Sequence, residues 1–327
     1  MYKRQKEGKH INTIKEDLEA LVDKRLHWTL LTLPILGIVI FTILPLVFMI
    51  CMAFTSYSKV GDHLTIFHWV GLKNFSTVLG MGNSIGKTFW SVLGWTLIWA
   101  VLATFLNYIL GMILAIVINR KTTRIKGFWR FCFMLSAAIP QFVSLLLMRT
   151  MLKDNGLINN LLVQAGLISS PLPFLTNATW ARATVVIINL WVGIPFTMMQ
   201  VTGILQNIPG ELYEAARVDG AGPVTIFFKI TLPYMLFVTT PYLITTFTGN
   251  INNFNVIYLL TAGAPVPVGA TAGKTDLLVT WLYKLTVDLQ YFNVGAVVGI
   301  LTFVILAVVS LITYRNTGSY KNEEGFQ

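Results

Sequence analysis

From Pro209 to Pro223 the sequence reads Pro-Gly-Glu-Leu-Tyr-Glu-Ala-Ala-Arg-Val-Asp-Gly-Ala-Gly-Pro, a short polar segment between two long apolar runs. Residues 211–218 are mostly good helix formers, and Gly220 and Gly222 predict an abrupt end to that helix. A segment this rich in charge does not cross a bilayer. The pattern predicts a short helix exposed on one side of a membrane, where a partner can bind it. An ordinary surface loop is the alternative that spacing alone leaves open.

The composition of the whole chain is that of a helical membrane protein. Of the 327 residues, 55% are hydrophobic and 12% are charged, and the mean hydropathy is +0.68, whereas a soluble domain carries about 25% charged residues. The apolar residues form blocks of roughly 20 residues or more, the length of a helix that crosses the hydrocarbon core. We therefore predict an all-α integral membrane protein with six transmembrane helices, at residues 29–52, 89–118, 131–151, 181–205, 234–256 and 292–314.

These spans and the segments between them define the predicted domain organisation. Residues 1–28 are charged but carry apolar side chains at near-helical spacing, which predicts an amphipathic helix at the membrane surface. Residues 29–86 hold the first span and an outer loop, residues 87–314 form the core membrane domain, and residues 315–327 form a polar tail. Within the core, the segment 206–233 contains the short polar helix.

The basic residues predict the orientation of the spans. The 24 Lys and Arg residues divide into 16 in one alternating set of connecting segments and 8 in the other. The larger set includes the dense cluster between Asn119 and Arg130, both ends of the chain and the segment around Glu214. The positive-inside rule places this set in the cytoplasm. We therefore expect cytoplasmic termini and a cytoplasmic polar helix, and we interpret the net charge of +10 as a topology signal, not as a nucleic-acid-binding surface.

The acidic residues argue against a carrier driven by an ion gradient. All 14 carboxylates lie outside the predicted spans, whereas such carriers place ionisable groups at membrane depth. A separate ATPase is then the favoured source of energy. The chain has no ATP site of its own, because Gly273-Lys274-Thr275 resembles the end of a P-loop but Val268 stands where the loop requires its first glycine.

Neither an enzyme nor a metal site is predicted. The four histidines, at positions 10, 27, 63 and 68, have no paired metal-ligand spacing. No arrangement of a nucleophile with a base stands out. A membrane scaffold or receptor without transport activity remains an alternative, but it does not account for the exposed polar helix.

Uncharged hydrogen-bonding residues repeat at helical spacing in two of the predicted spans. Each set follows the spacing i, i+4, i+7, so its members share one helix face. The first face is Asn189, Gly193 and Phe196, and the second is Thr246, Asn250 and Asn253. Two such faces can line a cavity whose amides, hydroxyls and rings suit the hydroxyl groups and C–H faces of a sugar. The same residue types also join helices in bilayers, and spacing does not decide between the two roles.

Several motifs resemble the membrane subunits of ABC importers. Glu214-Ala215-Ala216, Gly220 and Ile230-x-Leu232-Pro233 are similar to the EAA loop, which in that family forms a coupling helix in a cleft of a separate ATPase subunit. Further motifs resemble the maltose/maltodextrin-type sugar permeases, and the resemblance covers roughly residues 70–314. These motifs are Asn250-Ile-Asn252-Asn253-Phe254, Tyr258-Leu-Leu-Thr261 and Thr275-Asp-Leu-Leu278.

The resemblance implies a type I ABC importer permease fold with a cytoplasmic coupling helix, in the plasma membrane of a bacterium. The implied partners are a second homologous permease subunit, a dimeric ATP-binding cassette ATPase, an extracellular solute-binding protein, the lipid bilayer and an oligosaccharide substrate. ATP and Mg²⁺ would bind to the partner ATPase, so we expect no cofactor in this chain. The residues implied to couple the chain to the ATPase are Glu214, Ala215, Ala216, Asp219 and Gly220.

The resemblance also assigns a substrate site. The residues implied to bind the sugar are Gln141, Asn189, Gly193, Phe196, Thr246, Asn250 and Asn253. Asn189, Gly193, Asn250 and Asn253 are the same in the family's reference member. That member has Tyr where this chain has Phe196, and Ser where this chain has Gln141 and Thr246. A further Tyr of that pocket is replaced by Ala137. We therefore predict import of a maltodextrin, with another di- or oligosaccharide as the alternative.

Overall fold

The structure is a computed structural model that describes residues 26, 28, 30–58, 68–120 and 122–315. Helices dominate this part of the chain, and its one isolated β-bridge pairs Thr55 with Trp69. The predicted all-α class is confirmed. The amphipathic helix expected at residues 1–28 and the tail at residues 315–327 fall almost wholly outside the described residues.

Five helices in the described residues are long and apolar enough to cross a membrane, and a bent helix pair makes a sixth candidate. The five are Leu30–Ala53, Ser84–Asn119, Ala178–Gln206, Pro223–Ile251 and Phe292–Arg315. Each of the six predicted spans therefore has a counterpart. Three of these five long helices contain a π-helical turn, and the two without one are α9 (Ala178–Gln206) and α15 (Phe292–Arg315).

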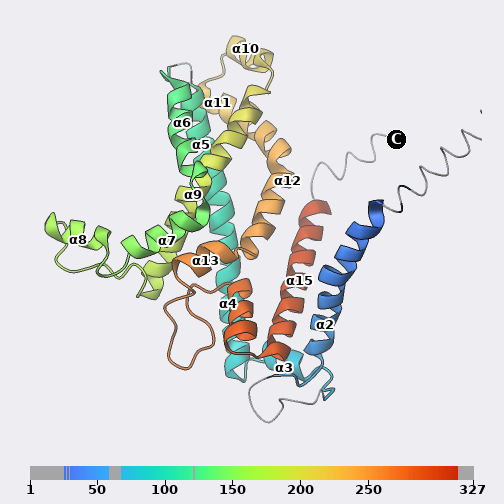
Figure 1. The fold of residues 1–327 in the computed structure, drawn as a ribbon. Helices are drawn as coiled ribbons and strands as arrows, with labels where there is room; N and C mark the ends of the chain where they lie inside the picture. Colours follow the sequence, from blue (N-terminus) through green and yellow to red (C-terminus); the bar gives the residue numbers. More distant parts are fainter. Residues whose placement is uncertain (1–25, 27, 29, 59–67, 121, 316–327) are drawn as a thin grey trace, which may run out of the picture.

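Each of these π-helical turns divides its helix into parts that carry separate labels. The parts are η1 (Val39–Ile43) with α2 (Leu44–Ala53), α4 (Ser84–Val101) with η2 (Leu102–Leu106) and α5 (Asn107–Asn119), and α11 (Pro223–Ile226) with η3 (Phe227–Thr231) and α12 (Leu232–Ile251). The remaining elements are α3 (Lys73–Leu79), α6 (Lys126–Ala138), α7 (Gln141–Met151), α8 (Leu157–Gln164), α10 (Gly210–Val218), α13 (Phe254–Leu260), α14 (Leu278–Tyr283) and η4 (Lys284–Asp288). Figure 1 shows α10 at one end of the molecule and α3 and α14 at the other.

The third predicted span is not a straight helix. The chain bends by 83° between α6 and α7, so the span predicted at residues 131–151 is broken into two helices. Pro140 explains the bend: it has no N–H to donate, and its ring forces Ile139 into an extended conformation, with φ −77° and ψ 128°.

The fifth predicted span is shifted along the chain. Its helix covers residues 223–251, not 234–256. Pro223 begins the helix because a first-turn residue needs no N–H partner. The helix ends before Asn253, whose side chain caps α13 by accepting a hydrogen bond from the backbone N–H of Val256 (3.2 Å). The helical face predicted for Thr246, Asn250 and Asn253 is therefore wrong for Asn253.

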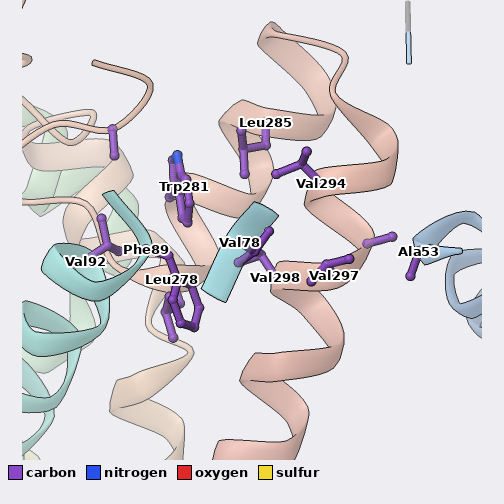
Figure 2. Packing of buried hydrophobic residues seen from close by; sticks show 12 residues of the cluster. Ala53, Val78, Phe89, Val92, Leu278, Trp281, Leu285, Val294, Val297 and Val298 are labelled. Carbon is purple, nitrogen blue, oxygen red and sulfur yellow. The ribbon is translucent and has the colours of Figure 1, made fainter. Parts of the chain in front are cut away.

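Three clusters of buried apolar side chains lie one after another along the helix Ser84–Asn119. The first cluster joins α2, α3, α4, α14 and α15, and its fully buried members include Phe89, Leu278 and Trp281 (Figure 2). The second surrounds Trp95 and Trp99, and the third lies nearer α10. By contrast, the most apolar stretch of Leu30–Ala53 has no buried residue. Apart from the part of α2 that packs against α15, this helix presents its apolar surface to the surroundings in the isolated chain.

Candidate functional site

A pocket of about 290 Å³ lies where the bend between α6 and α7 faces the middle of α9. The bend matters because it turns the start of α7 toward α9. The pocket is lined by Ser136, Ala137, Ile139, Pro140, Gln141, Ser144, Asn189, Trp191, Val192, Gly193 and Phe196. Four of the seven predicted substrate residues, Gln141, Asn189, Gly193 and Phe196, are thus brought together.

Polar and apolar side chains line the pocket together, and none of them is charged. Asn189 is only 7% exposed, and among the described residues its side chain has no hydrogen-bond partner. The rings of Trp191 and Phe196 are partly exposed beside it. Unpaired amide groups next to aromatic rings can bind a neutral ligand with many hydroxyl groups and C–H faces.

The other three predicted substrate residues do not line this pocket. Asn250 is 9% exposed, and its amide nitrogen donates to the hydroxyl of Thr104 at 3.0 Å. The Asn250 side-chain oxygen accepts a hydrogen bond from the amide of Asn253 at 3.4 Å. Thr246 is half-buried on α12. Asn250 and Asn253 thus form a polar network within the chain, at the break between α12 and α13.

Sequence reasoning missed several side chains at these places. Trp191, Ser136 and Ser144 line the pocket. The i, i+4, i+7 pattern does not find Trp191, because this residue lies two positions from Asn189 and is therefore not on the same helix face.

Three aromatic residues cluster just beyond the break between α12 and α13, and sequence reasoning missed them as well. The ring centroids of Phe254 and Tyr258 are 4.7 Å apart, and each is 5.2 Å from Tyr283. The hydrogen bond with Tyr283 raises the pKa of Tyr258 above its ordinary value.

The predicted polar helix is confirmed as α10. None of its side chains is buried, and Glu214 and Ala215 are exposed. Asp219 ends the helix, and Gly220 follows with a φ of +76°. The backbone N–H of Ala221 then donates to the carbonyl of Ala216 at 2.8 Å, which closes the helix end. Glycine suits this left-handed position because a Cβ would be strained there.

A single side-chain hydrogen bond joins α10 to the membrane-spanning helices in the described structure. The hydroxyl of Tyr213 lies 3.2 Å from that of Thr231 in η3. The carboxylate of Glu214 has no cation within 4.0 Å among these residues. The surface of α10 is therefore free to contact another molecule.

The loop that resembles part of a P-loop has a structural role. Asp276 is fully buried and accepts from the ammonium of Lys284 at 2.6 Å and from the backbone N–H of Gly273 at 2.7 Å. The hydroxyl of Thr275 lies 2.8 Å from that of Thr261. These contacts occupy the backbone N–H of Gly273 and the hydroxyl of Thr275, two groups that a phosphate-binding loop would use, and they give the loop a defined shape.

Comparison with known proteins places these features in a family. Residues 107–317 match the family described as binding-protein-dependent transport system inner membrane component. The chain is 36% identical over 325 residues to the galactooligosaccharides transport system permease protein GanP of Bacillus subtilis, covering 98% of this chain and 77% of that protein. It is 36% identical over 332 residues to the maltodextrin transport system permease protein MdxF of the same organism, covering 97% and 75%.

A solved structure agrees with this fold. A chain of a bacterial ABC transporter involved in the import of alginate superposes with a TM-score of 0.69 at 24% identity, covering 91% of this chain and 97% of that one. The spans, the exposed α10 and the family match over most of the chain lead to one conclusion. The chain belongs to the binding-protein-dependent transport system inner membrane components, the membrane-spanning permease subunits of ABC importers.

Proposed function

We propose that this chain forms one half of the membrane channel of an ABC importer for a neutral oligosaccharide. The observation that carries the proposal is the uncharged pocket at the α6–α7 bend, where Gln141 and Asn189 lie beside Phe196. Relatives named for galactooligosaccharides and maltodextrin support the same substrate class. The chain itself is a transport subunit, and ATP with Mg²⁺ binds to a separate ATPase.

A maltodextrin is the first candidate substrate, and a galactooligosaccharide is the second. The two relatives named for these sugars are equally similar to this chain, at 36% identity each. Ala137, Gln141 and Phe196 line the pocket and are the positions where the resemblance to the maltose/maltodextrin type is imperfect. We therefore assign the choice between the two sugars to these three side chains.

The proposed mechanism is alternating access. An extracellular solute-binding protein delivers the sugar, and Gln141, Asn189, Gly193 and Phe196 contact it in the pocket. Thr246, Asn250 and Asn253 line the same path from α12 and from its break with α13. A second homologous permease subunit completes the channel, as the resemblance to ABC importer permeases implies.

Movement of the ATPase reaches the spans through α10. We propose that Glu214, Ala215 and Ala216 dock in a groove of the ATPase dimer, while Asp219 and Gly220 form the turn behind them. The excess of basic residues supports a cytoplasmic position for α10 and for both termini in a bacterial plasma membrane. We propose the domain division expected from the sequence, with the coupling segment at residues 206–233.

The complex purified through this chain tests the proposal. It is reconstituted in lipid with its binding protein, and ATP hydrolysis is measured with maltodextrins, galactooligosaccharides and an unrelated sugar. Stimulation by maltodextrins is the expected result, and stimulation by galactooligosaccharides alone would keep the importer and change its substrate. The proposal is overturned if no ATPase co-purifies or if none of the sugars stimulates hydrolysis.

A further inference from the structure

The proposed sugar site has one half on α9 and the other half on α12, and both helices contact a π-helical turn in a third helix. This turn is η2, and it lies between α4 and α5 in the middle of the helix Ser84–Asn119. It contacts both α9, which carries the pocket, and α12, which carries Asn250. Single π-helical turns inside α-helices are frequent at functional sites.

Thr104 connects this turn to α12. Its side chain is only 1% exposed, and its hydroxyl accepts the hydrogen bond from the amide nitrogen of Asn250 at 3.0 Å. One turn earlier, the indole N–H of Trp99 donates to the backbone carbonyl of Asn250 at 3.2 Å. The Ser84–Asn119 helix therefore fixes both the backbone and the side chain of Asn250.

Asn107 connects the same turn to α9. Its amide nitrogen donates to the carbonyl of Ala103 inside η2 at 2.8 Å. The side chain lies directly against the backbone of Gly193, where an added Cβ would come within 2.7 Å of the Asn107 oxygen. The absence of a side chain at Gly193 therefore lets Asn107 pack against the wall of the pocket.

The side-chain oxygen of Asn107 is unusual. It is buried and has no hydrogen-bond partner among the described residues. A buried acceptor without a partner is unfavourable, and each such group in a native structure calls for an explanation. If Asn107 served only to fill space, an apolar side chain would avoid this unpaired acceptor.

We propose that Thr104 and Asn107 are positioning residues of the sugar site, which set the placement of Asn250 on α12 relative to Gly193 on α9. This inference rests on the proposed function. Neither side chain lines the pocket, so both act through the residues they touch. The η2 turn thus contacts both α9 and α12, and it sets the distance between these two helices and their relative position along their axes.

The alternative is ordinary helix packing, and the chain offers a contact of that kind for comparison. One turn further along, a Cβ at Gly111 would come within 2.7 Å of the side chain of Thr197. That contact joins the same pair of helices, α5 and α9, without touching Asn250, and it reaches Gly193 only through the hydrogen bond that the Thr197 hydroxyl donates to the Gly193 carbonyl at 3.4 Å. If η2 only packed helices together, changes at Gly111 and at Thr104 would have the same kind of effect.

The test compares three threonine variants in the complete reconstituted complex. Thr104→Val keeps the shape but removes the acceptor for Asn250, and Thr104→Ser keeps the hydroxyl. Thr302→Val is the matched control, because Thr302 is also buried but bonds only within α15, to the carbonyl of Val298. The readouts are transport of short and long oligosaccharides and the basal ATP hydrolysis of the complex.

We expect Thr104→Val to lower transport about tenfold, since it leaves the amide of Asn250 unpaired, and to change the ratio of short to long sugars transported. Thr104→Ser and Thr302→Val stay close to the wild type in transport and in selectivity, and basal hydrolysis is unchanged in Thr302→Val. Adding Thr104→Val to Asn250→Ala should lower transport little further than Asn250→Ala alone, because Thr104 acts through Asn250. A Thr104→Val complex with normal transport and normal selectivity overturns the inference, as does a failure of Thr104→Ser to retain them.

A distance measurement tests the positioning role of Thr104 independently of the proposed function. Spin labels are placed at Met199→Cys on α9 and Gly249→Cys on α12, after replacement of the exposed Cys51 and Cys132. Thr104→Val should shift or broaden the distance distribution, and Gly111→Ala serves as the packing control. An unchanged distribution contradicts the positioning role. Failure of the proposed function appears instead as a wild-type complex that no sugar stimulates.

Discussion

The two ends of the molecule differ in how far their charged and apolar side chains are buried and paired within the chain. At the end that holds α14, the buried carboxylate of Asp276 is enclosed by Lys284, Gly273 and Thr280, above a core centred on Trp281. At the opposite end, α10 buries no side chain and is tied to the spans by one hydroxyl pair. One end is therefore held together by a buried ion pair and an apolar core within the chain, whereas the other has the features of a surface that another subunit covers.

This comparison makes a graded prediction. Changes at the α14 end should act mainly on the stability of the chain. Changes around the pocket should act on both stability and transport. Changes on α10 should act on coupling to the ATPase and hardly at all on the fold.

The largest loss of stability is expected from Asp276→Ala. Removing one partner of a buried ion pair leaves the other charge unpaired, which costs about 3–5 kcal/mol. Thermal melting of the purified chain measures the loss. Asp154→Ala is the control, because Asp154 is exposed. Equal melting temperatures for the two variants would contradict the idea that the α14 end is held by this ion pair.

A smaller loss is expected from Gly193→Ala. The new methyl group would meet the side chain of Asn107 at 2.7 Å, and overpacking of this kind costs about 1–3 kcal/mol. Gly249→Ala is the control, because a Cβ there meets nothing within 4 Å.

The added change Asn107→Ala sharpens this prediction. It should relieve the clash and recover part of the melting temperature lost by Gly193→Ala. Transport should stay impaired in the double variant, because the contact that positions the pocket wall is still missing. Recovery of full transport would show that Gly193 is needed only for packing.

The next smaller effect is expected from Gly220→Val at the α10 end. Gly220 has a φ of +76°, and a β-branched residue in that conformation is strained by about 1–2 kcal/mol. We expect the turn after α10 to change shape, so that transport and sugar-stimulated ATP hydrolysis fall while the spans melt normally. Gly222→Ala is the matched control, because Gly222 has a φ of −72° and open space around it. Normal transport by Gly220→Val would argue against a coupling role for this turn.

Local sequence patterns predict the parts of this fold that depend on local properties. The apolar blocks predict the spans because their length and composition are determined residue by residue. The glycines at 220 and 222 predict the end of α10 because each acts on its own backbone. The bend at Pro140 was less well predicted, because a proline inside a span produces anything from a mild kink to a sharp turn, and the angle depends on what packs around it.

The site was only partly predictable, for a related reason. The i, i+4, i+7 pattern assumes an uninterrupted helix, which holds for Asn189, Gly193 and Phe196 on α9 but fails where α12 ends before Asn253. The contact between Asn250 and Thr104 joins residues 146 positions apart, and no local pattern reports it. Contacts of this kind become visible only once the helices are placed in space.

The smallest effect on stability is expected from Glu214→Gln on α10. Glu214 is exposed and has no cation within 4.0 Å among the described residues, and surface substitutions of this kind change stability by less than about 0.5 kcal/mol. The melting temperature of the isolated chain should therefore equal that of the wild type. If α10 is the surface that the ATPase covers, the same change should reduce the amount of ATPase that co-purifies, because a carboxylate in a docking groove forms stronger hydrogen bonds than an amide. Glu211→Gln, on the first turn of the same helix, controls for the loss of charge alone. A loss of stability without a loss of co-purified ATPase would contradict this prediction, because it would show that Glu214 stabilises the fold and does not bind the ATPase.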